Sequence, residues 1–131
     1  MAGITARYWR ECPQRYRGEA NKSAKTGRVF FPPRQVEPEN GNRKFKPVKL
    51  EYGGELLTFT VIRVAPQGFE KQSPYALAII QLDGGGRITT QVTDIPVDNV
   101  KIGMRVHVEF RKINDDGVEG IHMYGYKVVP E

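Results

Sequence analysis

The sequence is poor in the residues that build catalytic and metal sites. It has one cysteine, Cys12, and two histidines, His107 and His122, among 131 residues. A single cysteine excludes an internal disulfide and a four-cysteine zinc site. Neither histidine has a partner at metal-ligand spacing, and no Ser-His-Asp, Cys-His or paired-carboxylate arrangement stands out. We therefore expect a protein without catalytic residues, a metal or a cofactor.

Long hydrophobic runs are also missing. No apolar stretch approaches the roughly 18 residues of a membrane span, and the first residues, MAGITARYWRE, contain no apolar signal-peptide segment. The 39% hydrophobic and 27% charged fractions are typical of a soluble globular protein. We therefore expect a cytoplasmic protein that does not contact a membrane.

Negative charge is scarce in the first part of the chain. Residues 1–50 hold 12 Lys and Arg against 4 Asp and Glu, a net charge of +8, whereas residues 51–131 hold 8 against 11, a net charge of −3. Any surface that attracts phosphate is therefore expected on the N-terminal part of the chain.

The sequence pattern changes near residues 47–52 and divides the chain into two expected units, 1–47 and 48–131. After Tyr52 the pattern predicts strands over residues 57–62, 75–82, 87–93, 104–111 and 121–129. In MRVHVEFR the alternation predicts inward-facing side chains at Met104, Val106, Val108 and Phe110. Five strands with short turns and a longer link over 94–103 predict a mainly β protein with a five-stranded OB-fold barrel.

The sequence of the N-terminal unit predicts a short helix and a small ribbon. Thr5 is a candidate N-cap for a helix over residues 6–11, and Pro13 is expected to end or redirect it. Residues 14–19 and 27–31 are expected to form two short strands joined by the KSAKTG turn. Pro32 and Pro33 stop the second strand.

Residues 22–40, KSAKTGRVFFPPRQVEPEN, have the outline of a zinc ribbon that lacks its ligands. When C-x-x-C-G, a strand, a proline corner and a second C-x-x-C are written over this stretch, the ligand positions fall on Ser23, Thr26, Glu37 and Asn40. Two hydroxyls, a carboxylate and an amide are a poor ligand set for structural zinc. We expect a zinc-ribbon-like segment without metal that is kept for its shape, which favours a docking role.

Two motifs are the most specific parts of the chain: the F-F-P-P-R corner at 30–34 and the S-P-Y start of the second barrel strand. With these motifs, and with runs such as LLTFTVIRVAPQGF and VKIGMRVHVEF, nearly the whole chain resembles the acyl-CoA-associated proteins that join a rubredoxin-like zinc ribbon to an OB-fold. It looks most like the archaeal member that forms a complex with acetoacetyl-CoA thiolase and 3-hydroxy-3-methylglutaryl-CoA (HMG-CoA) synthase. That member acts early in the mevalonate pathway of isoprenoid biosynthesis.

The resemblance implies a non-catalytic scaffold subunit that bridges these two enzymes. Trp, Tyr and Arg dominate protein-interface energetics, and such residues gather in the N-terminal unit. The expected partner-binding residues are Tyr8, Trp9, Arg10, Tyr16, Arg17, Phe30, Phe31 and Arg34. The alternative for these residues is local packing of a small appendage.

Two other functions stay open at this point. OB-folds commonly bind single-stranded nucleic acid in a positively charged groove, where aromatic side chains stack on the bases. Residues 51–131 are mildly acidic, however, and Phe59 and Phe110 occupy strand positions whose side chains are expected to be buried. The chain could instead complete the active site of a partner enzyme. A peripheral contact between its basic residues and coenzyme A also stays open.

Overall fold

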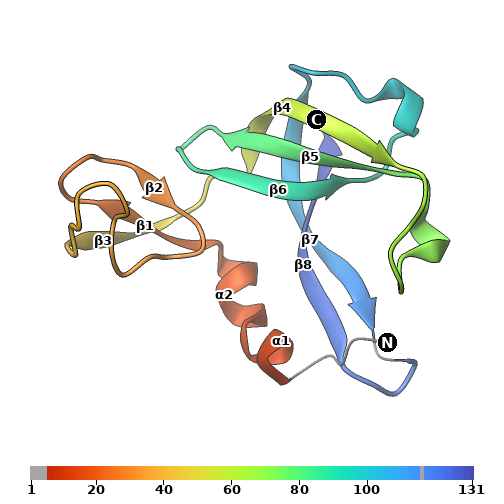
Figure 1. Cartoon of the computed structure of the whole chain (residues 1–131), viewed down its shortest axis with the longest axis horizontal. Helices are drawn as coiled ribbons and strands as arrows, with labels where there is room; N and C mark the ends of the chain where they lie inside the picture. The colour runs from red at the N-terminus through yellow and green to blue at the C-terminus, as the bar shows by residue number, and fades with distance from the viewer. Residues whose placement is uncertain (1–5, 116) are drawn as a thin grey trace.

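Two β-structures make up most of the chain, and a short helical segment precedes the first of them (Figure 1). The computed structural model describes residues 6–115 and 117–131, so the Thr5 cap predicted for the first helix lies outside the described residues. None of the described helices is long and apolar enough to cross a membrane.

The larger structure is a closed barrel with the strand order β4-β5-β6-β8-β7, in which only β6 and β8 pair in parallel. Its strands are β4 (Gly53–Ile62), β5 (Tyr75–Leu82), β6 (Arg87–Val92), β7 (Arg105–Asp115) and β8 (His122–Pro130). The link between β6 and β7 contains one short 3-10 helix, η2 (Val97–Asn99). The predicted five-stranded OB-fold barrel is confirmed, and β5 has the predicted bounds.

Aliphatic side chains at alternate strand positions fill the barrel. Leu56, Ile80 and Val106 have no exposed surface, and burying a side chain of this size contributes about 1.5–3 kcal/mol. Gly54 allows β4 to approach β5 closely, because a Cβ atom there would lie 2.7 Å from the carbonyl oxygen of Gln81. The alternating pattern of the sequence therefore matches the physical core of the barrel.

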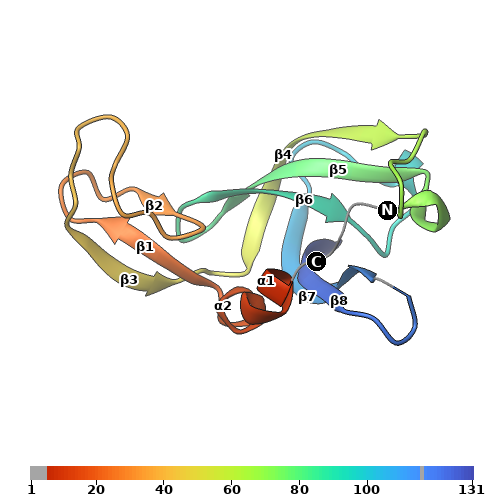
Figure 2. The ribbon, with the colours of Figure 1, turned by 60° about the horizontal axis from the view of Figure 1, so that its bottom comes forward.

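Strands β7 and β8 continue past the barrel as a two-stranded hairpin (Figures 1 and 2). Strand β7 pairs with β4 only over 105–107, whereas it pairs with β8 along 106–115. Of the side chains predicted to face inward, those of Val106 and Val108 are therefore buried, whereas that of Phe110 is only half-buried. The prediction that Phe110 faces the core was wrong, because at that point β7 has left the closed part of the barrel.

Helices α1 (Ala6–Arg10) and α2 (Cys12–Arg17) lie against β8. The prediction of a strand over 14–19 was wrong, because residues 12–17 form a second helix. The first helix ends at Arg10, before Pro13, as expected, but the chain continues as α2. Pro13 stands in the first turn of α2, where proline is tolerated because its missing N–H would have no intrahelical partner. Gly18 ends α2 in the left-handed region, with φ of 60°.

The smaller structure is a three-stranded sheet, called the ribbon here, with the order β2-β1-β3. Its strands are β1 (Glu19–Ser23), β2 (Val29–Phe30) and β3 (Phe45–Lys49). Strand β2 lies inside the predicted 27–31 segment, but β3 was not predicted and runs across the expected boundary after residue 47. The sheet tolerates Pro47 because β3 is an edge strand. Figure 2 shows the ribbon projecting from one end of the barrel.

Candidate protein-interaction surface

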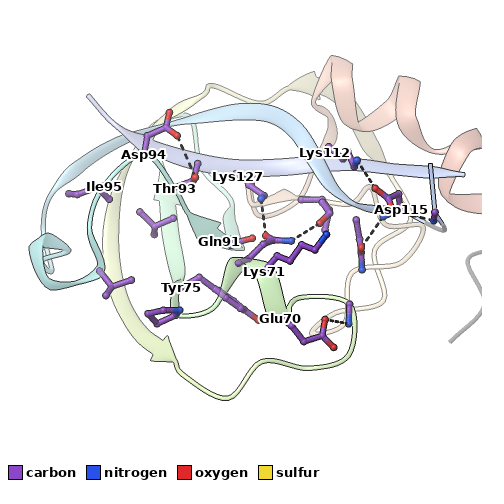
Figure 3. Close-up of a pocket in the computed structure, with 18 residues that line it drawn as sticks. Glu70, Lys71, Tyr75, Gln91, Thr93, Asp94, Ile95, Lys112, Asp115 and Lys127 are labelled. Carbon is purple, nitrogen blue, oxygen red and sulfur yellow. Dashed lines mark hydrogen bonds and ion pairs between the residues drawn. The ribbon is translucent and has the colours of Figure 1, made fainter. Parts of the chain in front are cut away.

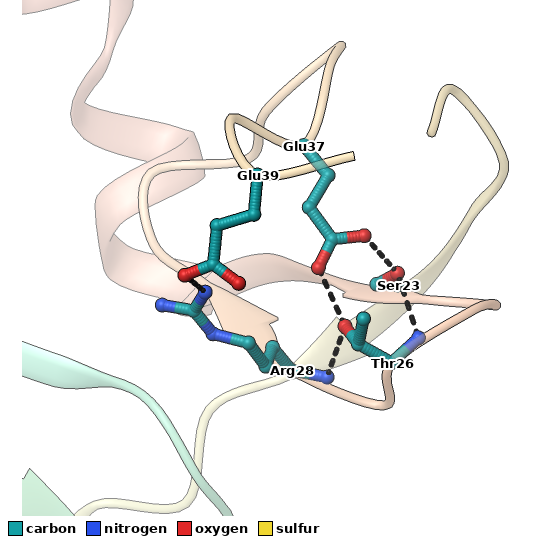
Figure 4. A network of polar contacts seen from close by, with 5 residues as sticks. All are labelled: Ser23, Thr26, Arg28, Glu37 and Glu39. Atoms are coloured by element: carbon teal, nitrogen blue, oxygen red, sulfur yellow. Dashed lines mark hydrogen bonds and ion pairs between the residues drawn. The ribbon is translucent and has the colours of Figure 1, made fainter. Parts of the chain in front are cut away.

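Three of the four ligand-like positions meet in the ribbon around one buried carboxylate (Figure 4). Glu37 has no exposed surface, and the hydroxyls of Ser23 and Thr26 donate to its Oε2 and Oε1 atoms at 2.6 Å each. Ser23 Oγ in turn accepts the backbone N–H groups of Lys25 and Thr26 at 3.2 Å. The turn after β1 is therefore tied through Glu37 to a segment 11 to 14 residues further along the chain.

The fourth position, Asn40, belongs to the turn on the other side of this network. Its Oδ1 atom accepts the backbone N–H of Asn42 at 2.8 Å, and Asn42 Nδ2 donates to Ser23 Oγ at 3.1 Å. Hydrogen bonds from Ser23, then Thr26, and then these two asparagines hold the pKa of Glu37 below its usual value despite the burial of the side chain. The carboxylate thus stays ionised as the centre of a polar cluster.

This donor set does not fit a structural zinc ion. Zinc ribbons use thiolate or imidazole ligands, whereas here the hydroxyls of Ser23 and Thr26 donate hydrogen bonds to the carboxylate of Glu37. Within residues 6–115 and 117–131, no group of three or more His, Cys, Asp and Glu side chains is placed to hold a metal ion. An ion pair between Arg28 and Glu39, at 2.6 Å, lies beside the network but is exposed (Figure 4).

The predicted partner-binding residues of the ribbon are engaged within the chain. Phe30 is 8% exposed, and the guanidinium groups of Arg28 and Arg34 lie 5.2 and 5.4 Å from its ring centre. Phe31 packs on Tyr126 of β8, with ring centres 5.3 Å apart. The structure therefore places Phe30 in the ribbon interior and Phe31 at the junction between ribbon and barrel, and neither aromatic ring faces solvent freely.

The predicted residues of the helices are placed differently, because they stand on the surface. The side chains of Trp9, Tyr16 and Tyr8 are 69%, 66% and 38% exposed, and Arg10 and Arg17 are exposed beside them. Arg17 pairs with Glu19 at 2.6 Å, a contact that contributes little at an exposed site. The structure thus brings these five predicted residues together on one helical segment.

Two tyrosines of the barrel hold this helical segment in place. The hydroxyl of Tyr52 donates to the backbone carbonyl of Tyr16 at 2.9 Å, and the hydroxyl of Tyr126 donates to the carbonyl of Arg15. Burial raises the pKa of Tyr126, so its hydroxyl keeps its proton at neutral pH. Both bonds are made to carbonyls in the last turn of α2, where the Arg15 carbonyl also accepts the backbone N–H of Gly18 at 3.1 Å.

The hairpin extends the helical segment into a wider aromatic surface. Tyr16 contacts the edge of Phe110 with ring centres 5.4 Å apart, and Phe110 stacks on Tyr124 at 5.7 Å. We call the helical residues and these two rings together the helix–hairpin surface; it consists of the exposed Tyr8, Trp9, Arg10, Tyr16, Arg17 and Tyr124 and the half-buried Phe110. Sequence reasoning missed Tyr124 and placed Phe110 in the core. The only signal for Tyr124 was the YGY run of the last strand.

Similar sequences from known proteins decide the family. A Methanocaldococcus jannaschii protein described as a DUF35 domain-containing scaffold protein is 41% identical over 128 residues, which cover 97% of this chain and 91% of that protein. The chain belongs to the DUF35 family. DUF35 scaffold proteins of Methanothermobacter thermautotrophicus and Pyrococcus furiosus are each 36% identical to it. These two matches cover 100% and 95% of this chain, and 99% and 91% of the relatives.

Solved DUF35 structures share the fold. A chain described as "Ltp2-ChsH2(DUF35) aldolase" superposes with a TM-score of 0.72 at 22% identity, covering 99% of this chain and 98% of that one. A Sulfolobus solfataricus DUF35 protein of unknown function gives 0.57 at 16% identity, covering 95% and 83%. The family described as "ChsH2, C-terminal OB-fold domain" matches residues 47–111. The DUF35 scaffold relatives support a scaffold or accessory role for this chain.

Proposed function

We propose that the chain is a non-catalytic scaffold that bridges acetoacetyl-CoA thiolase and HMG-CoA synthase in the early mevalonate pathway. The scaffold descriptions of its DUF35 relatives support the general role. The two enzymes come from the resemblance of the sequence motifs. The observation that carries the proposal is the helix–hairpin surface, where Trp9 and Tyr16 are more than half exposed yet stand on helices that the barrel holds in place.

This surface has the properties of a protein anchor. Trp, Tyr and Arg supply most of the energy at protein interfaces, where they fill pockets of the partner. The side chain of Trp9 is 69% exposed and is not part of the barrel core, so its apolar area is available to a partner. Because the backbone of α2 is already hydrogen-bonded to the barrel, less conformational entropy is lost when a partner binds.

A bridge needs a second surface of different character. The helical part of the helix–hairpin surface belongs to residues 1–50, which carry a net charge of +8, whereas residues 51–131, which form the barrel and the hairpin, carry a net charge of −3. We assign the second enzyme to the barrel. Condensation of two acetyl-CoA molecules is thermodynamically uphill, so a scaffold that holds the next enzyme beside the first helps draw the product forward.

The test is assembly of the two enzymes with and without this chain, followed by size exclusion. With Trp9→Ala we expect binding to weaken by about 2–4 kcal/mol, a loss of roughly 30- to 1,000-fold in affinity. Lys46→Ala, at an exposed position on β3 of the ribbon and outside both proposed surfaces, is the matched control and should leave assembly unchanged. Circular dichroism of both variants should equal that of wild type, because neither residue belongs to the core.

Two results would overturn the scaffold role in this form. The first is assembly of the thiolase and the synthase to the same extent without this chain. The second is a Trp9→Ala variant that binds both enzymes with wild-type affinity, which would mean that the helix–hairpin surface is not part of the interface.

Binding of single-stranded nucleic acid is the second candidate function. The sequence predicted a buried Phe110, but the ring is half-buried and lines a hollow together with the exposed Arg17 and Lys49, a combination that suits stacked bases. One face of Phe110 is already covered by Tyr124, however, and Tyr16 meets its edge. We expect only salt-sensitive binding that largely vanishes near physiological ionic strength. Tight binding there by fluorescence anisotropy would favour this function over the scaffold.

A further inference from the structure

A cavity of about 670 Å³ opens beside the barrel, at a place that the proposed scaffold role does not use (Figure 3). It lies between η1 (Glu70–Gln72), the segment that follows β6, and the end of the β7–β8 hairpin. Its volume is in the range of small-molecule sites, roughly 300–1,000 Å³. No residue of the helix–hairpin surface lines it.

Lys127 is the buried cation of this cavity. Its side chain is 9% exposed, and in Figure 3 it points from β8 toward η1, where its ammonium donates to Gln72 Oε1 at 3.1 Å. An ammonium has three donors, and Gln72 accepts one. Lys127 takes part in none of the ion pairs formed among the described residues. Burial lowers its pKa, which reflects the cost of holding this charge away from water.

The carboxylates near Lys127 are committed to other cations. Asp94 accepts two hydrogen bonds from Arg111, at 2.8 and 2.7 Å. Asp115 pairs with Lys112 at 2.5 Å. Each of these ion pairs is neutral on its own. Among the residues that the structure describes, no carboxylate forms an ion pair with Lys127.

A second lysine lines the cavity beside a glutamate of the same turn. Lys71 belongs to η1 and lines the same cavity. Its neighbour Glu70 is engaged by the backbone N–H of Gly68 at 2.9 Å. Glu70 keeps its negative charge beside Lys71, so an anionic occupant is favoured by Lys127, the buried ammonium that forms no ion pair among the described residues.

The rest of the lining decides the size and character of that occupant. Apolar side chains form much of the wall: Pro74, Val92, Ile95, Val97 and Ile113. The aromatic residue among the described lining is Tyr75, which is only 9% exposed. Single strands of nucleic acid are bound through exposed aromatic faces, so this wall suits a small molecule better than a strand.

We propose that this cavity binds a small organic anion, in which a carboxylate or phosphate is held by Lys127 and a short apolar group rests on the aliphatic wall. The proposal goes beyond the scaffold function and does not depend on it, because the cavity shares no residue with the helix–hairpin surface. Loss of either site leaves the other intact, so the two proposals fail separately.

The experiment is calorimetric titration of the full chain with four probes: hexanoate, hexyl phosphate, hexanol and inorganic phosphate. We expect one of the two amphipathic anions to bind saturably at one site. Hexanol and inorganic phosphate should each bind at least tenfold more weakly, because each lacks one half of the ligand. The comparison of hexanoate with hexyl phosphate identifies the anionic group.

Variants place the binding in the cavity. Lys127→Met should weaken binding at least tenfold and keep the fold, since an apolar side chain is tolerated where a buried charge had no carboxylate partner. Gln72→Glu, on η1 and outside the strands, should also weaken binding at least tenfold, because it sets a carboxylate against the ammonium. Lys46→Met, an exposed position on β3, should bind like wild type.

Three outcomes overturn the proposal. They are no saturable binding of either anion, equal affinity in Lys127→Met or Gln72→Glu, and amide shifts in nuclear magnetic resonance that fall on α1 and α2 instead of η1 and β8. Displacement of hexyl phosphate by a short oligothymidylate that binds more tightly would replace the small-molecule ligand with nucleic acid.

Discussion

The ribbon and the barrel of this chain are stabilised by different interactions. The barrel encloses aliphatic side chains such as Leu56 and Ile80, which have no exposed surface. The ribbon buries polar side chains instead: Ser23 is 2% exposed, Asn21 is 9% exposed, and Glu37 is completely buried. The two structures are neighbours in one short chain, yet one excludes water from hydrocarbon and the other encloses a hydrogen-bonded carboxylate.

The difference shows how a segment too small for an apolar core can still hold a fixed shape. The ribbon contributes a two-residue strand, β2, and little aliphatic surface. Its buried polar atoms are satisfied, and none of the buried side-chain nitrogen or oxygen atoms in the described part of the chain lacks a partner. A fully satisfied polar cluster is rigid, whereas a partly satisfied one is costly. Because the ribbon has little aliphatic surface and depends on one carboxylate, we expect it to be less stable than the barrel and sensitive to protonation of Glu37.

Introducing four cysteines is expected to have the largest effect on the difference between ribbon and barrel, because it would replace the polar cluster of the ribbon with a metal site. Ser23, Thr26 and Glu37 already converge, and Asn40 lies in the adjoining turn. The quadruple variant Ser23→Cys, Thr26→Cys, Glu37→Cys and Asn40→Cys is expected to bind one zinc ion, with an apparent free energy on the order of 10 kcal/mol. Wild type purified in parallel is expected to contain no stoichiometric zinc. Elemental analysis measures both, and zinc in wild type would contradict the hydrogen-bonded interpretation of the ribbon.

Removing core volume from the barrel is the next largest expected effect. Leu56→Ala should lower the free energy of unfolding by about 2–5 kcal/mol, because it leaves a cavity among side chains with no exposed surface. Denaturant unfolding followed by circular dichroism measures it. Val64→Ala, at a 90% exposed position, is the control and should change stability by less than about 0.5 kcal/mol. Equal effects of the two substitutions would mean that the barrel does not depend on this core.

Acid should affect the ribbon through Glu37. Because its pKa in the folded chain is lowered, the stability it contributes is present above the unfolded pKa of about 4.3 and is lost as pH falls through the folded value. We expect ribbon amides such as that of Thr26, which donates to Ser23, to lose protection below about pH 4 before the amides of β5 do. Hydrogen exchange at a series of pH values measures the difference.

Substitution at residue 37 isolates the group responsible. Glu37→Gln keeps the shape of the side chain and removes its titration, so its ribbon amides should show little dependence on pH in the same range. Arg28→Ala, which removes an exposed ion pair with Glu39, should keep the acid response, since exposed pairs contribute only about 0–1 kcal/mol. An unchanged acid response in Glu37→Gln would assign it to another carboxylate.

Residue patterns predicted the barrel better than the N-terminal part, for physical reasons. Strand β5 has the expected bounds because alternate burial repeats along its full length. In the helical segment, the first helix stops before Pro13 as expected, but α2 was predicted as a strand although the first turn of a helix accepts proline. Strand β3 escaped prediction because Pro47 and its lysines do not look like a strand, and only its edge position makes them acceptable.

The candidate surface was only partly visible in the sequence. Residue type alone pointed to Trp9 and Tyr16, and the structure leaves both exposed. The same reasoning selected Phe30, which the structure buries at 8% exposure. Aromatic residues serve cores and interfaces equally well, so composition cannot separate the two uses.

By itself, the sequence determined which segments are strands of a closed five-stranded barrel, because a side-chain period of two is a local property of an extended chain. The tertiary structure alone decided that Glu37 would become the buried centre of the ribbon, that Phe110 would leave the core to meet Tyr16, and that Lys127 would lie in a cavity. Each of these depends on contacts between residues far apart in the chain. Their burial is set by the path of the backbone, which no local pattern records.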